Sequence, residues 1–219
     1  MHRFATFAVM VAVLVAAAVV PSAVRAAGRR GPDIRTRPAP AKPRQRSLVV
    51  PVTVHVATPV SAARITAWVR RANEALAPHG LAVRVVRVVP AGEGHRRVRR
   101  ARDRRRLGRL ARPDGTLHVF VVDEVAVGPR LGRRRDVVRG LYWRFQRLGG
   151  STREFVVVTK HAPVTTFVHE VGHAFGLPHR PGVENLMCSC RRGLRQTFTP
   201  SQGRRMRMGA RRFLARARR

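Results

Sequence analysis

The chain has 219 residues, of which 44% are hydrophobic and 26% are charged. It is long enough to bury a core, and the composition excludes a largely disordered chain. The formal net charge is +34, and among the 45 basic residues only Lys42 and Lys160 are lysine. Two cysteines are too few for a disulfide framework.

The high positive charge has two interpretations. Such a surface would bind polyanions or anionic surfaces non-specifically, whether nucleic acid, acidic polysaccharide or anionic lipid. The alternative is a compositional preference for arginine, in which the side chains are simply solvated. Arginine is spread along the whole chain, which favours the second interpretation. A preference for negatively charged partners follows from either.

Residues 1–26 are typical of a secretory signal peptide. Arg3 precedes an uncharged apolar run, and a cleavage site follows it after Ala26. An apolar run of this length could instead be an uncleaved membrane anchor. We expect cleavage, and therefore a secreted or extracytoplasmic protein that is membrane-anchored only if the segment is retained. Residues 27–46 are rich in proline and arginine and predict a linker or short pro-segment, and residues 47–219 the folded domain.

Two strands are predicted at the start of this domain, and a helix between them. Leu48–Val56 and Leu81–Val89 are short and rich in β-branched residues. Pro51 inside the first run suggests an edge strand or a bulge, because proline cannot donate to a sheet ladder.

The helix between these strands has its own start and stop signals. Thr58 suits the N-cap, Pro59 the first helical position, and Gly80 the position just past the end. Apolar residues at helical spacing form one buried stripe: Ile65, Trp68, Val69, Ala72 and Leu76.

Glu93–Arg112 is dense in arginine with few apolar anchors, which predicts either a solvated helix or a mobile basic loop. Three strands follow, at Thr116–Asp123, at Gly140–Phe145, which would lie at a sheet edge, and at Glu154–Thr159. This order predicts an α+β fold with one mixed twisted sheet and a backing helix.

The string HEVGH at residues 169–173 follows the last strand and lies in a predicted helix. Residues i and i+4 project from one helix face, so His169 and His173 can bind one metal ion. Gly176 permits a sharp turn that can bring His179 to the same ion. Three imidazoles and one water make an open tetrahedral site, which indicates a catalytic Zn²⁺ rather than a structural one.

Glu170 lies beside these ligands and is not needed as one. It can take a proton from a zinc-bound water and pass it to the leaving amine of a peptide bond. The sequence therefore predicts a zinc-dependent endopeptidase that acts on protein or peptide substrates. Two alternatives are a secreted cationic polyanion-binding protein with a non-catalytic metal site, and a zinc hydrolase of a non-protein amide.

With these residues the chain resembles the metzincin clan of metallopeptidases, whose string His-Glu-x-x-His-x-x-Gly-x-x-His is followed by a methionine turn. Met187 lies eight residues beyond His179, a spacing similar to that of the matrixin branch. The resemblance implies a Met-turn in which Met187 forms a hydrophobic base under the metal without ligating it. It also implies that residues 141–145 are the edge strand along which an extended substrate pairs. The resemblance covers residues 48–219, but its specific residues lie between 169 and 187.

The C-terminal helix implied by the resemblance has its own signals. Residues 199–202 form a capping box with proline at the first helical position. One apolar stripe follows, made of Met206, Ala210, Phe213 and Ala217.

The chain also departs from the family's pattern. No tyrosine follows Met187, no cysteine precedes the histidine string, and calcium loops are not evident among only 11 acidic residues. A calcium requirement therefore stays open. Cys188 and Cys190 are interpreted as an oxidised or structural pair, with free thiols or a stray metal as alternatives. The other histidines with no partner spacing are interpreted as surface or packing residues: His55, His79, His95, His118 and His161.

Overall fold

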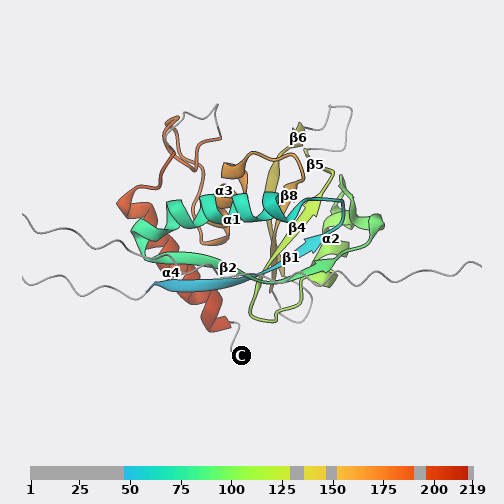
Figure 1. Ribbon diagram of the computed structural model, residues 1–219, viewed down its shortest axis with the longest axis horizontal. Coiled ribbons are helices and arrows are strands. Elements are labelled where there is room, and N and C mark those ends of the chain that lie inside the picture. Colours follow the sequence, from blue (N-terminus) through green and yellow to red (C-terminus); the bar gives the residue numbers. More distant parts are fainter. Residues whose placement is uncertain (1–46, 129–135, 147–151, 190–195, 217–219) are drawn as a thin grey trace, which may run out of the picture. The chain divides into compact units, whose positions relative to one another are not determined.

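The computed structural model describes residues 47–128, 136–146, 152–189 and 196–216 (Figure 1). The predicted signal peptide and linker lie outside the described residues, and so do Cys190 and Ala217. Among the described residues, no helix is both long and apolar enough to cross a bilayer.

A five-stranded mixed sheet lies at the centre of the described domain (Figure 1). The strand order is β2-β1-β4-β8-β7, and β7 runs antiparallel to β8 while the other neighbours are parallel. The strands are β1 (Leu48–Val56), β2 (Leu81–Pro90), β4 (Leu117–Val122), β7 (Gly140–Gln146) and β8 (Thr152–Thr159). All five predicted strands are confirmed, and β7 is an edge strand as expected.

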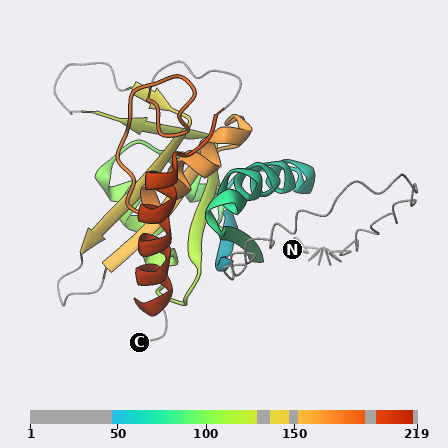
Figure 2. The ribbon, with the colours of Figure 1, turned by 90° about the vertical axis from the view of Figure 1, so that its left-hand side faces the viewer.

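Helices cover both faces of this sheet. One face carries α1 (Ala62–Leu76), α3 (Val164–Ala174) and α4 (Pro200–Arg216), the last drawn in red in Figure 2. Their apolar residues share one cluster with Val52 of β1 and Val119 of β4. On the other face, Leu107 of α2 (Ala101–Leu110) packs in a cluster with Phe120 of β4. Because β4 is covered on both faces, all six of its residues are buried.

A second, smaller sheet was not expected from the sequence. Its strands, in the order β3-β5-β6, are β3 (Arg97–Val98), β5 (Glu124–Val127) and β6 (Asp136–Val138). Runs of two to four residues are too short to show the alternation from which a strand can be predicted. The arginine-rich segment is likewise neither one helix nor one loop, since it holds the 3₁₀ turn η2 (Glu93–His95), β3 and α2.

The predicted start of the first helix is wrong. Ser61 is the N-cap of α1, and its side chain accepts a hydrogen bond from the Arg64 backbone N–H. Thr58 instead donates its hydroxyl to Asp123 Oδ1 over 2.6 Å, because the chain is still leaving the end of β1. At the other end, the 3₁₀ turn η1 (Ala77–His79) follows α1, and Gly80 ends it with φ of 63°.

Pro51 does not mark an edge strand, since β1 lies between β2 and β4. Its pairing with β4 begins only at Val52, one residue beyond the proline. The expected irregularity is present, because the register with β2 shifts between Val52 and Thr53. Proline is tolerated inside the sheet because only one neighbour pairs with it there.

His55 and His118 are packing residues, in agreement with the interpretation from the sequence, and the structure adds that they contact each other. They lie on neighbouring strands, both buried, with His55 Nε2 2.8 Å from His118 Nδ1. The His118 Nε2–H donates to the Arg112 carbonyl at 2.6 Å, so Nδ1 is left as the acceptor from His55. Sequence spacing could not reveal this pair, because the two residues are 63 positions apart.

Candidate active site

Helix α3 carries the first two histidines of the string. It runs from Val164 to Ala174, and Pro163 is its N-cap. The helix ends before Gly176, whose φ of 89° places it in the left-handed region. The backbone N–H groups of Gly176 and Leu177 close the helix on the carbonyls of His173 and Gly172. This turn reverses the chain and returns His179 toward α3.

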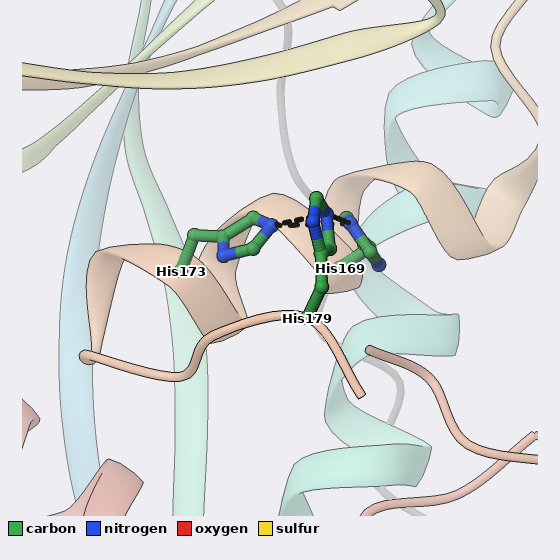
Figure 3. Close-up of side chains that lie close together, drawn as sticks. All are labelled: His169, His173 and His179. Carbon is green, nitrogen blue, oxygen red and sulfur yellow. Dashed lines mark hydrogen bonds between the residues drawn. The ribbon is translucent and has the colours of Figure 1, made fainter. Parts of the chain in front are cut away.

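The three histidines converge on one point (Figure 3). His173 Nε2 lies 3.2 Å from His169 Nε2 and 3.1 Å from His179 Nε2, and the third Nε2–Nε2 separation is 3.3 Å. Ligands at about 2.0–2.1 Å from a tetrahedral ion would be about 3.3–3.4 Å apart. The observed spacing therefore fits a zinc-sized ion held by three imidazole nitrogens.

The hydrogen bonds behind the rings decide which nitrogens face one another. His169 Nδ1 lies 2.6 Å from the Leu186 carbonyl, and His173 Nδ1 lies 2.7 Å from the Leu177 carbonyl. Because a carbonyl only accepts, Nδ1 carries the proton in both rings, and Nε2 of each neutral ring has a lone pair. Lone pairs this close repel one another, and a cation between them removes the repulsion.

Glu170 lies next to His169 on α3 and is only 6% exposed. Its side chain packs against Gly140 at the start of β7, where an added Cβ would lie 2.7 Å from Glu170 Oε1 and 2.9 Å from its Cγ. A larger residue at position 140 would therefore displace the carboxylate. The sequence offered no signal for this contact, because it joins two elements that are distant along the chain.

A cleft of about 820 Å³ opens over this group, within the size range of ligand sites. Residues of β7 and its approach form one wall, and α3 forms another. The lining includes Glu170 and all three histidines, together with Arg139, Leu141, Tyr142, Thr166 and Gln196.

Met187 lies beneath α3 and is fully buried. Its Sδ would be 2.5 Å from a Cβ added to Gly172, so the glycine in the middle of the helix lets the methionine approach closely. The Met187 N–H donates to Asn185 Oδ1 over 2.9 Å. Cys188, the next residue, is buried and disulfide-bonded. This loop after His179, the Met187 loop, therefore packs under the histidines and supplies the Leu186 carbonyl that orients His169.

The predicted capping box at the start of α4 is confirmed, and its Gln202 also bonds to a residue outside the helix. The Thr199 N–H donates to Gln202 Oε1 at 2.8 Å, and the Gln202 N–H donates to Thr199 Oγ1 at 3.3 Å. The Gln202 amide also pairs with Asn185 of the Met187 loop. Neither residue of that pair was recognised from the sequence as part of the site.

Comparison with known proteins agrees with this geometry. The sequence profile of the peptidase M66 family matches residues 139–189, from the approach to β7 through the Met187 loop. No sequence match was found among curated proteins. The profile and the histidine cluster support a zinc-dependent peptidase.

Two solved structures are similar in fold. Metalloproteinase-II from Bacteroides fragilis is 13% identical with a TM-score of 0.50, over 76% of this chain and 55% of that one. The chain thus spans about half the length of that protein. Archaemetzincin from Methanopyrus kandleri is 16% identical with a TM-score of 0.52, over 77% of this chain and 99% of that one. Both likenesses concern the mixed α+β fold, which is similar to zinc metallopeptidase folds.

Proposed function

We propose that the chain is a secreted zinc endopeptidase in which His169, His173 and His179 hold one Zn²⁺ and Glu170 is the catalytic base. The observation that carries the proposal is the convergence of three Nε2 atoms, two of them in rings whose Nδ1–H groups donate to backbone carbonyls. Anchored, neutral imidazoles with one position left open are the donor set of a catalytic zinc site.

A zinc ion at this place would supply Lewis acidity, by acidifying water and polarising the scissile carbonyl. The carboxylate of Glu170 would take the proton of the attacking water and deliver it to the leaving amine nitrogen. The contact of Glu170 with Gly140 supports this role, because a substrate backbone paired with β7 would lie beside the Glu170 carboxylate. In the described structure β7 pairs with β8 alone, which leaves its outer edge available to an extended peptide.

The proposal extends to the type of enzyme. Met187 beneath Gly172 supports a Met-turn, and Gly176 with its positive φ supports a metzincin-type third ligand. The spacing of eight residues from His179 to Met187 favours a matrixin-like arrangement. The apolar run and cleavage site within residues 1–26 support export.

The test measures bound zinc and casein hydrolysis for the purified protein and for Glu170→Gln. We expect one zinc per chain in both, and turnover at least about a hundredfold lower in the variant. Glu184→Gln is the matched control, since Glu184 is an exposed acid on the Met187 loop and should leave both values unchanged.

Three outcomes would contradict the proposal. Full activity in Glu170→Gln would remove the general base. Zinc without hydrolysis in the unmodified protein would favour the polyanion-binding protein or a hydrolase of a non-protein amide. Absence of zinc would mean that the histidines are not a zinc site.

A further inference from the structure

Two charged side chains of opposite sign line the cleft, and they differ in exposure. Arg139 is the one arginine in the cleft lining and is exposed, and Glu170 is the one acid. Arg139 directly precedes Gly140, the residue that packs against Glu170. Arg139 therefore lines the same cleft as Glu170, next in sequence to the glycine that Glu170 contacts.

The acid that contacts Tyr142 of the cleft lining is already paired. Glu154 of β8 accepts a hydrogen bond from the hydroxyl of Tyr142, a residue of the cleft lining, over 2.8 Å. Arg216 of α4 forms an ion pair with the other carboxylate oxygen. Burial, together with the Glu154 carboxylate, raises the pKa of Tyr142 to well above its usual value, so the phenol stays neutral. The wall behind Tyr142 thus presents no unpaired negative charge.

Acids elsewhere in the described domain also have arginine partners. Asp114 pairs with Arg87, Asp123 with Arg96, and Glu124 with Arg99. By contrast, none of the ion pairs within the described ranges involves Arg139, nor Arg180, which follows the third histidine and is exposed. Most acids of the described domain are therefore paired with arginine. Exposed positive charge remains at Arg139 in the cleft lining.

We propose that the substrates are acidic polypeptides, with an aspartate or glutamate side chain close to the scissile bond contacted by Arg139. The inference rests on the proposed peptidase function. A net charge of +34 would draw such chains toward the protein at a distance, and Arg139 would select among them at short range. A lysine or arginine of the substrate at the same place would meet the like charge of Arg139.

The experiment digests a library of peptides derived from a whole proteome and maps the cleaved bonds by mass spectrometry. For the unmodified protein we expect Asp and Glu, counted within three residues of the cleaved bond, to be enriched about fivefold over Lys and Arg. The enrichment should shrink at 0.5 M salt, because exposed charge pairs are screened.

Two variants separate the local effect from the net charge. Arg139→Glu should lose or invert the preference while still cleaving. Arg105→Glu makes the same charge change on the exposed side of α2, on the opposite face of the sheet, and should keep the preference. Equal cleavage beside acidic and basic residues would overturn the inference, and an unchanged preference in Arg139→Glu would remove Arg139 from it. Absence of any cleaved bond would instead be a failure of the proposed function itself.

Discussion

Asn185 and Gln202 form a reciprocal amide pair that ties the Met187 loop to the start of α4. Asn185 Nδ2 donates to Gln202 Oε1 over 3.1 Å, and Gln202 Nε2 donates to Asn185 Oδ1 over 3.0 Å. The same oxygen of Asn185 accepts the Met187 N–H, and the same oxygen of Gln202 accepts the Thr199 N–H. This pair of amides, of which Gln202 is buried, thus stabilises a helix N-terminus and the loop beneath the histidines.

Replacing Asn185 by alanine should test this link. The change leaves the side-chain NH2 group of the buried Gln202 and the Met187 N–H without these acceptors, which should cost about 2–3 kcal/mol of unfolding free energy. Zinc affinity should fall as well, because the carbonyl of the adjacent Leu186 orients His169. Urea unfolding and a zinc titration measure the two effects. Ser201→Ala, an exposed position in the same helical turn, is the control and should change neither by much.

Gly172→Ala should disturb the site from inside α3. The new Cβ would overlap Met187 Sδ, so the methionine or the helix must move, at a cost of about 1–3 kcal/mol. Combining it with Met187→Ala should recover part of that loss, since the overlapping atom is gone, and a double-mutant cycle measures the coupling. Gly94→Ala, where an added Cβ meets nothing within 4 Å, should be close to neutral. Additive effects of the two substitutions would mean that the close contact is unimportant.

Removing the metal should destabilise the folded protein. Free zinc at a hundredfold excess over its dissociation constant stabilises the folded state by about 2.7 kcal/mol, so a chelator should lower Tm and added zinc should restore it. His173→Ala loses one of the three converging nitrogens, and its Tm should respond weakly to the chelator. His161→Gln, at an exposed histidine outside the cluster, should respond like the unmodified protein.

The His55–His118 pair should make folding sensitive to acid. Burial and the neighbouring His118 lower the pKa of His55 from 6.5 to about 4. Between these values the unfolded chain binds a proton at His55 and the folded chain does not. Stability is therefore full above pH 6.5 and falls by up to about 3 kcal/mol as the pH drops to 4.

Urea unfolding at a series of pH values checks this prediction. His55→Gln should show a shallower loss of stability between pH 6.5 and 4 than the unmodified protein, while the exposed His161→Gln should follow the unmodified protein. Contributions that are common to all three proteins cancel in the comparison. An identical slope in His55→Gln would show that the pair does not control the acid response.

Much of the fold could be predicted because its signals are local. The β-branched runs of β1 and β4 and the capping box at Gln202 each lie within about ten consecutive residues. The start of α1 was misplaced because Thr58 and Ser61 are both good N-caps, and only the contact with Asp123 shows which of them is otherwise engaged. The small sheet was missed because its pairings, such as Val125 with Val138, join short segments through space.

By itself, the sequence determined the chemistry at the centre of this protein: two histidines one helical turn apart, an acid between them, and a glycine that lets the chain turn back with a third. These features depend on helix periodicity and on backbone sterics, which act over a few residues. Only the tertiary structure decided which contacts position these residues. The Leu186 carbonyl behind His169, Gly140 against Glu170 and Met187 beneath Gly172 join separate elements, and sheet order and packing, rather than spacing along the chain, bring them together.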